Sequence, residues 1–289
     1  MHVRPLADLR AADAALFGGK SASLGELIAA EIPVPPGFGL SSAAAEADLD
    51  EVADAYRALG EPAVAERSSA LGEDSAETTF AGLQDTYLWV QGADAVCAAV
   101  RDCWASLANP EAVAYRERMG IEGTPAMGVT VQLMADAAVS GVMFTCNPVS
   151  GDPSTVAVNA SWGLGVAVVG GEVTPDEYRV SKVTGEVLHR AIGPKLIEYG
   201  PGGERSDVPP ERQEVACLDD ERLAELVEVA RRIERHFGSH QDIEWAIDRG
   251  GELFMLQSRP VTVLARAERP AGKSAIDLVM GTFGANKKD

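Results

Sequence analysis

Two alternating segments near the C-terminal end of the chain, joined by a glycine pair, most constrain its fold. Residues 241–247 alternate polar and apolar side chains, and residues 253–260 follow after the tetrapeptide Arg-Gly-Gly-Glu at 249–252. Alternation with a period of two is typical of a β-strand whose faces differ, and two glycines suit a two-residue hairpin turn. The pattern therefore predicts an antiparallel β-hairpin.

The register of this hairpin would gather four polar side chains on one face. Counting back from a turn at residues 250–251 places Glu244 opposite Gln257 and Asp242 opposite Arg259. A face this polar is costly to cover with apolar groups. Mg²⁺ takes carboxylate and amide oxygens, and arginine suits phosphate. Two interpretations stay open from the register alone, a site for magnesium and nucleotide phosphates and an exposed, salt-bridged hairpin face.

Size and charge exclude several classes of protein. A chain of 289 residues usually forms one large domain or two lobes. The 25 basic residues against 44 acidic ones give a net charge of −19, which argues against a nucleic-acid or membrane surface as partner. We find no apolar run of about 18 residues and no leader, so we expect a cytoplasmic protein. The four cysteines lack zinc-site spacing and are expected to be reduced thiols.

The remaining pattern predicts a mixture of helices and strands. Strands are expected at residues 127–134, 141–145 and 156–159, with a pair of strands within 178–190. A helix is expected after the Asp219-Asp220 cap, with an apolar stripe up to Phe237. Residues 66–82 predict an ordered loop that carries function, and residues 198–216 a mobile or linking segment.

Two further segments could bind phosphate. Lys20 follows two glycines where a helix begins, and free N–H groups there favour anions, although the spacing of a P-loop is absent. Arg67 and Ser68 precede a Phe-Ala-Gly segment ending at Gly82, and a guanidinium, hydroxyls and glycine N–H groups can wrap a phosphate. A solvated lysine and an arginine paired with acids at residues 73–77 remain the alternatives.

Nine short motifs follow one another between about Leu16 and Thr262. They lie at residues 18–25, 34–38, 67–70, 80–82, 141–145, 162–165, 174–176, 242–245 and 256–260. In this order they resemble the N-terminal ATP-binding domain of phosphoenolpyruvate synthase, pyruvate phosphate dikinase and rifampin phosphotransferase. Three positions depart from the pattern of that family, and we expect them to affect nucleotide affinity and lid geometry. They are Glu66 in place of an apolar residue, Leu83 in place of a glutamine and Val166 in place of a glutamate.

The resemblance implies an α+β protein with the ATP-grasp fold, in which two lobes clamp the nucleotide. Mainly antiparallel sheets with flanking helices are expected. We expect a nucleotide-binding domain over residues 1–265, with lobes at roughly 1–125 and 126–265. Residues 266–289 would form a C-terminal tail or docking segment.

The resemblance also assigns roles to residues. Lys20, Arg67 and Arg259 are the expected catalytic residues, and Glu244 and Gln257 the expected ligands of Mg²⁺. The strand around Gln132 to Met134 is expected to border the adenine. The full set expected to bind ATP is Lys20, Arg67, Ser68, Gly82, Gln132, Met134, Asp242, Glu244, Gln257 and Arg259.

Enzymes of this family use ATP to phosphorylate a histidine on a mobile domain, giving AMP and phosphate. None of the four histidines lies in a matching phosphohistidine motif. We therefore expect a dikinase-type phosphotransferase that is active only with a separate subunit carrying that histidine and the acceptor site. The expected acceptor is a small hydroxyl compound, a phenol in preference to pyruvate or an antibiotic. The alternatives are an ATP-binding regulatory module without hydrolysis and a fragment of a full-length enzyme.

Overall fold

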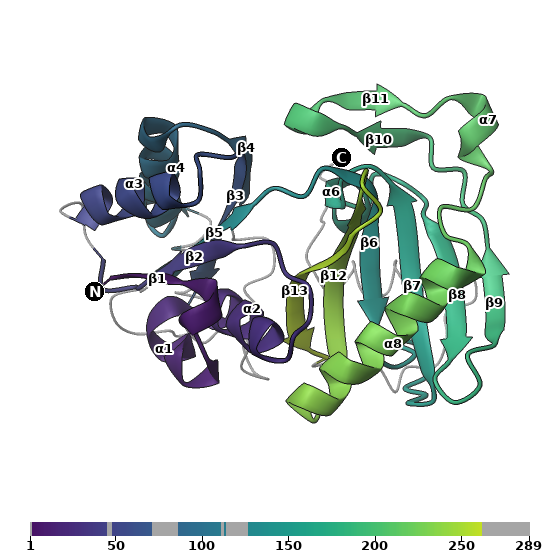
Figure 1. Cartoon of the computed structure of the whole chain (residues 1–289). Coiled ribbons are helices and arrows are strands. Elements are labelled where there is room, and N and C mark those ends of the chain that lie inside the picture. Colours follow the sequence, from purple (N-terminus) through teal and green to yellow (C-terminus); the bar gives the residue numbers. More distant parts are fainter. Residues whose placement is uncertain (1, 45–47, 71–85, 111–112, 114–126, 262–289) are drawn as a thin grey trace. The chain divides into compact units, whose positions relative to one another are not determined.

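The chain divides into two compact units, each built around a β-sheet (Figure 1). The computed structural model describes residues 2–44, 48–70, 86–110, 113 and 127–261. The first unit comprises Met1–Ala29 and Val34–Met134, and the second comprises Ala30–Pro33 and Ala135–Asp289. In the described residues, no helix combines the length and the apolar composition needed to cross a membrane.

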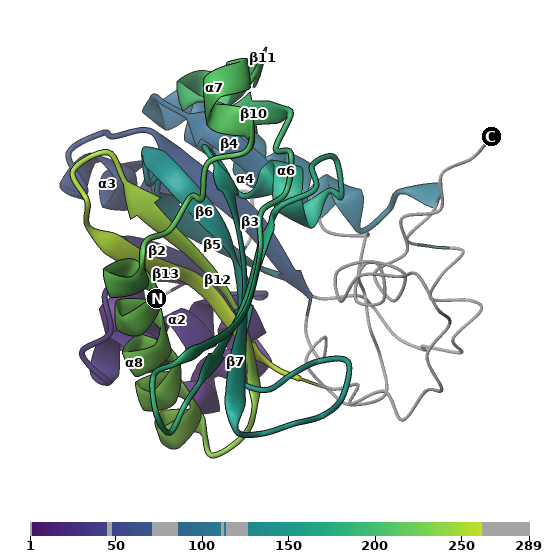
Figure 2. The ribbon, with the colours of Figure 1, turned by 90° about the vertical axis from the view of Figure 1, so that its right-hand side faces the viewer.

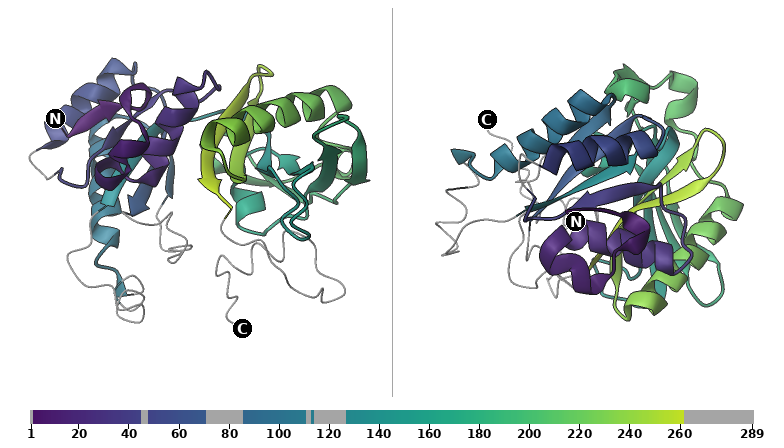
Figure 3. Two further views of the ribbon diagram at one scale, coloured as in Figure 1. Left: turned by 90° about the horizontal axis from the view of Figure 1, so that it is seen from below. Right: turned by 60° about the vertical axis from the view of Figure 1, so that its left-hand side comes forward.

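The first unit contains a five-stranded antiparallel sheet. In spatial order its strands are β1 (Val3–Pro5), β2 (Gly37–Leu40), β5 (Met127–Leu133), β3 (Val64–Ala70) and β4 (Thr86–Val90). Its helices are η1 (Leu6–Asp8), η2 (Ala11–Asp13), α1 (Ala14–Phe17), α2 (Gly19–Ala29), α3 (Leu49–Ala58) and α4 (Ala93–Ser106). Helices α3 and α4 lie side by side (Figure 3) and share an apolar core with β3 and β5 that includes Tyr56, Val100 and Val131. On the other face of the sheet, Ser21 of α2 and Thr130 of β5 share a hydrogen bond of 2.7 Å.

The second unit contains a six-stranded antiparallel sheet. In spatial order its strands are β13 (Leu253–Pro260), β12 (Gln241–Asp248), β6 (Ala137–Phe144), β7 (Thr155–Trp162), β8 (Asp176–Ser181) and β9 (Val187–Ala191). Helix α8 (Asp220–Phe237) lies over one face of this sheet (Figures 1 and 2). Ile243 and Trp245 of β12 are fully buried. The smaller elements are α6 (Val166–Val169), β10 (Ile197–Tyr199), η4 (Pro201–Gly203), β11 (Arg205–Asp207) and α7 (Pro210–Gln213).

Most of the secondary structure expected from the sequence is confirmed, including the α+β class with mainly antiparallel sheets. The expected strands correspond to β5 to β9, and α8 begins after Asp219, whose side chain accepts a hydrogen bond of 2.8 Å from the Arg222 N–H. Two expectations are wrong. Residues 66–70 belong to β3, because hydrogen bonds from β4 and β5 on both sides override the low strand propensity of Ser-rich sequence. Residues 198–216 form β10, β11 and α7 instead of a linker.

A buried ion pair holds the loops beside β8 together. The side chains of Asp176 and Lys195 are both fully buried and paired with each other. The Asp176 carboxylate also accepts hydrogen bonds from the N–H groups of Gly193 at 3.0 Å and Cys217 at 2.7 Å, and from the Tyr178 hydroxyl at 3.1 Å. Asp176, the last residue of the motif at 174–176, therefore joins two segments that are distant in sequence to the start of β8.

A second acidic side chain is buried without any such partner. Glu66 points from β3 into the core beneath α4 and is 0% exposed, and neither of its carboxylate oxygens has a hydrogen-bond partner among the described residues. Burial raises the pKa of Glu66 from 4.5 to about 9, with a smaller contribution from the negative charge of Asp102. Glu66 is therefore a neutral carboxylic acid at neutral pH.

Glu66→Met is expected to change how stability depends on pH. The folded-state pKa of Glu66 is raised, so its contribution to stability is complete below pH 4.5 and is lost as the pH rises toward 9. The variant lacks this loss, so its stability relative to the natural protein should increase by about 1.4 kcal/mol per pH unit in that range. Urea unfolding at two pH values within the range measures the difference. Glu51→Met on the exposed face of α3 is the control, and a pH-independent difference for Glu66→Met would contradict the assignment.

Asp176→Ala is expected to lower the free energy of unfolding by about 3–5 kcal/mol, because it leaves the Lys195 ammonium buried without a counter-charge. Denaturant unfolding measures the loss. The double variant Asp176→Leu/Lys195→Met removes both charges and should recover part of that loss. If the single variant is as stable as the natural chain, the pair does not hold these loops together.

Candidate functional site

Arg67 and Gln132 form the centre of the candidate site in the first unit. Arg67 lies on β3, and its Nη2 donates a hydrogen bond of 2.5 Å to Oε1 of Gln132 on β5. The Gln132 amide in turn donates from Nε2 to the carbonyl oxygen of Pro35 at 3.3 Å. Both side chains are buried, with 9% and 2% of their surface exposed. Gln132 therefore fixes the orientation of the guanidinium in addition to any role at the nucleotide base.

Lys20 is brought to the same face of the sheet by Ser69. Its backbone N–H, at the start of α2, donates a hydrogen bond of 3.2 Å to Ser69 Oγ. A Cβ atom at Gly18 would lie 2.3 Å from that hydroxyl oxygen, so the glycine permits the close approach. Because side chains alternate along a strand, Ser69 shares the face of Arg67, whereas Ser68 lies on the opposite face and is fully buried.

Ser69 belongs to the Arg-Ser-Ser segment considered for phosphate but was not in the set expected to bind ATP, and recognition of β3 as a strand would have placed it on the face of Arg67. Of the other residues expected in this unit, Met134 follows β5 and donates its backbone N–H to the carbonyl oxygen of Ala63 at 2.9 Å. Gly82 and Leu83 lie outside the described residues.

The expected register of the hairpin in the second unit is confirmed. Asp242 pairs with Arg259, and Glu244 pairs with Gln257. The Arg259 guanidinium donates from Nε to Asp242 Oδ2 at 3.0 Å, and its Nη2 lies 2.9 Å from the same oxygen. Burial raises the pKa of Asp242, while the adjacent Arg259 opposes the shift and the charge of Glu244 adds to it. The four expected side chains therefore lie together on one face of β12 and β13.

The turn that joins the two strands differs from the expected one. Asp248 pairs with Glu252 through a hydrogen bond of 2.9 Å from its N–H, which leaves a three-residue loop with Gly251 at a φ of +86°. Such loops require a left-handed residue, and glycine adopts that conformation without strain. The extra residue is compensated by a bulge between Glu244 and Trp245. The register beyond the bulge is the one that a two-residue turn would have produced.

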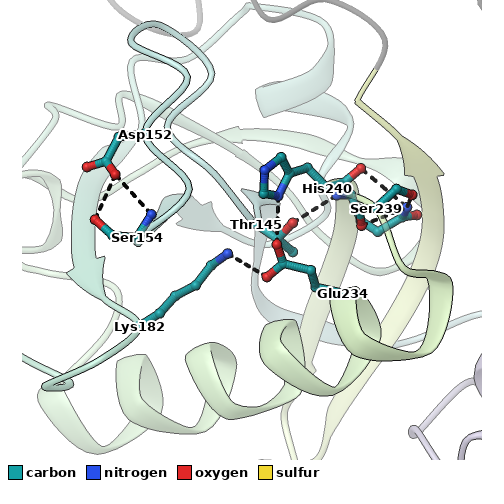
Figure 4. Close-up of polar contacts among 8 residues, drawn as sticks. Thr145, Asp152, Ser154, Lys182, Glu234, Ser239 and His240 are labelled. Atoms are coloured by element: carbon teal, nitrogen blue, oxygen red, sulfur yellow. Dashed lines mark hydrogen bonds and ion pairs between the residues drawn. The ribbon is translucent and has the colours of Figure 1, made fainter.

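Polar contacts fix the start of β12 against α8 (Figure 4). Glu234 of α8 lies between two basic side chains, 2.5 Å from Lys182 Nζ and 2.6 Å from His240 Nδ1. The next backbone N–H, that of Gln241, donates to Thr145 Oγ1 at 2.9 Å. These contacts anchor the residues directly before Asp242.

The side-chain oxygen atoms on this face of β12 and β13 suit a magnesium ion that is also coordinated by a bound ligand. Among the described residues, no group of three or more His, Cys, Asp or Glu side chains could hold a metal ion. Glu244 and Gln257, an adjacent cross-strand pair, offer carboxylate and amide oxygens. Mg²⁺ is commonly bound by one or two such protein groups, with water and phosphate oxygens completing its shell. The residues present therefore fit a magnesium–nucleotide complex better than a metal site made by protein alone.

Comparison with known proteins indicates a nucleotide-binding domain. A family model described as the pyruvate phosphate dikinase AMP/ATP-binding domain matches residues 45–278. A probable phosphoenolpyruvate synthase of Methanothermobacter thermautotrophicus is 36% identical over 329 residues, covering 95% of this chain and 48% of the relative. The phosphoenolpyruvate synthase of Pyrococcus furiosus is 41% identical over 258 residues, covering 82% of this chain and 32% of the relative.

The chain thus spans less than half the length of both relatives. A solved structure of a dinucleotide-forming acetyl-coenzyme A synthetase from Ca. Korarchaeum cryptofilum has a TM-score of 0.48 and 15% identity, covering 83% of this chain and 90% of that one. The family match confirms the ATP-grasp fold expected from the nine motifs.

Proposed function

The chain belongs to the family of the pyruvate phosphate dikinase AMP/ATP-binding domain, and from this premise we propose that it is the ATP site of a dikinase-type phosphotransferase. The observation that carries the proposal is the register of Asp242 with Arg259 and of Glu244 with Gln257. Phosphoryl transfer depends on positioned cations and metal more than on a protein nucleophile. This face offers both kinds of group.

The residues of each unit take separate roles in the proposal. In the second unit, Asp242 orients the Arg259 guanidinium toward phosphate, and Glu244 and Gln257 hold Mg²⁺. In the first unit, Gln132 orients Arg67, and Lys20 contributes a further positive charge. Bound magnesium would neutralise charge on the phosphates. Gly82 and Met134 remain proposed nucleotide contacts, whereas the side chain of Ser68 lies buried on the face of β3 opposite Arg67 and is not proposed as one.

The proposed domain division follows the sequence. Residues 1–265 are proposed as the nucleotide-binding domain; the lobes expected from the sequence at roughly 1–125 and 126–265 differ from the two compact units, which divide between Met134 and Ala135. The proposed tail or docking segment, residues 266–289, lies outside the described residues.

We place the histidine that accepts the phosphoryl group outside this chain. Three of its four histidines already contact neighbouring side chains: His2 with Ser41 at 3.1 Å, His236 edge-on to Phe237, and His240 with Glu234. The chain spans only part of its relatives, so their remaining activities would reside in other domains. A separate subunit is proposed to carry the phosphohistidine and the acceptor site, with a phenol-type hydroxyl compound as acceptor. Pyruvate and an antibiotic are the other acceptors considered.

A second candidate function is binding of ATP without its consumption, as a regulatory module. The buried Glu66, directly before Arg67, favours it, because an acid stands where the family has an apolar residue. A third candidate is that the chain is the ATP-binding part of a longer phosphoenolpyruvate-synthase-like enzyme, with the same site.

The reaction products separate these functions. Incubation of the chain with a histidine-domain protein encoded beside it, ATP, Mg²⁺ and a panel of phenols should yield AMP and phosphate, measured by chromatography. Formation of ADP alone, or no turnover with any partner, would contradict the phosphotransferase. Tight ATP binding with no phosphorylated partner histidine would support the regulatory module.

Glu244→Gln is expected to weaken the response of nucleotide binding to magnesium. Replacing the carboxylate by an amide removes the charged ligand, and the Mg²⁺ concentration for half-maximal ATP binding should rise about tenfold, which corresponds to about 1.4 kcal/mol. Calorimetric titration of ATP at several Mg²⁺ concentrations measures the change. Glu252→Gln, exposed beside the hairpin loop, is the matched control. An unchanged magnesium response for Glu244→Gln would move the ligand elsewhere.

A further inference from the structure

Asn159 lies in the same transverse row of the second sheet as the proposed magnesium ligands. On β7 it pairs with Val142 of β6, which pairs with Glu244 of β12, which pairs with Gln257 of β13. Residues directly opposite one another in a sheet point to the same face. Asn159 is therefore on the face of Glu244 and Gln257, two strand spacings or about 10 Å from Glu244.

Asn159 is almost fully buried, and the described residues give its side chain no hydrogen-bond partner. Only 4% of the residue is exposed, and its amide makes no hydrogen bond within the described part of the chain. Asn147 in the same unit differs, because its Oδ1 accepts hydrogen bonds from the N–H groups of Val149 at 2.9 Å and Ser150 at 3.1 Å. Buried amides are normally hydrogen-bonded, so Asn159 calls for a partner that the described residues do not supply.

The two acids beside Asn159 mean that an anion can bind there only together with a cation, as the phosphates of a magnesium–nucleotide complex do. The row of Asn159 continues to Glu177 on β8, so the amide lies between the acids Glu177 and Glu244 in that row. Val142, which separates it from Glu244, is only partly buried. A neutral amide adds a hydrogen-bond donor for an anion without adding negative charge to a row that already has two carboxylates.

We propose that Asn159 is a further residue of the nucleotide site, where its side-chain N–H groups donate to phosphate oxygens of bound Mg·ATP. The inference rests on the proposed function and extends it, because it places part of the phosphate chain over β6 and β7. Asn159 then acts as a binding residue for the phosphates and has no contact with the adenine or ribose.

The test compares a ligand that has phosphates with one that lacks them. Asn159→Leu should weaken binding of the magnesium complex of a non-hydrolysable ATP analogue at least about tenfold, as expected for loss of hydrogen bonds to a charged group. The affinity of Asn159→Leu for adenosine, which has no phosphate, should equal that of the natural chain. Asn159→Ser, which keeps a shorter donor, should lie between Asn159→Leu and the natural chain. Thr155→Val is the control, because it removes another buried, unpartnered side-chain group from the same face of β7 and should change neither affinity.

The outcomes distinguish this inference from the function on which it rests. Equal weakening for both ligands, or no weakening for either, overturns the role of Asn159. If the natural chain does not bind the analogue, the proposed function itself fails. If Glu244→Gln weakens binding and Asn159→Leu does not, only the inference about Asn159 fails. Thermal unfolding checks that the variants fold, and Asn159→Ser decides the question if Asn159→Leu does not fold.

Discussion

The arrangement of the second unit depends on the pairing of β12 with strands on both of its sides. β13 and β6 both pair with it, so its register decides which side chains face the candidate site. A slip of one residue would exchange the two faces and move the buried side chains of Ile243 and Trp245 to the opposite face. The apolar burial on one face therefore holds the carboxylates in place on the other. The contacts of Glu234, Lys182 and His240 secure the same strand at its beginning.

Strand alternation has an equally direct effect in the first unit. Glu66 and Arg67 are adjacent residues of β3, one with an acidic and one with a basic side chain. Strand alternation points them to opposite faces of the sheet. The Arg67 guanidinium, which is always protonated in proteins, donates a hydrogen bond to the Gln132 amide in a largely buried place. Glu66 finds no hydrogen-bond partner among the described residues, and it is neutral instead, since its pKa rises to about 9. The two side chains show the two ways in which a buried ionisable group is accommodated.

Local patterns were sufficient for much of the fold and for half of the candidate site. The alternation at residues 241–260 predicted both strands and the pairing of Glu244 with Gln257, although the predicted turn was too short. That pairing survived because a bulge, which leaves no mark in a single sequence, compensated for the longer loop. β3 was missed because its Ser-rich sequence has low strand propensity, and its pairing with β5 joins segments far apart in the chain. The partners of Asp176 and Arg67 were out of reach for the same reason, since each contact is long-range.

Because Glu66 is neutral only in the folded state, folding at neutral pH is coupled to the uptake of a proton from the solution. In neutral solution the unfolded chain carries Glu66 as a carboxylate, whereas the folded chain holds it as an acid. Each molecule that folds must therefore take up a hydrogen ion at this position, much as a metalloprotein takes up its metal. The proton on Glu66 is then part of the folded core around β3. The proton concentration of the solution therefore affects the folding equilibrium of the sheet whose opposite face carries Arg67.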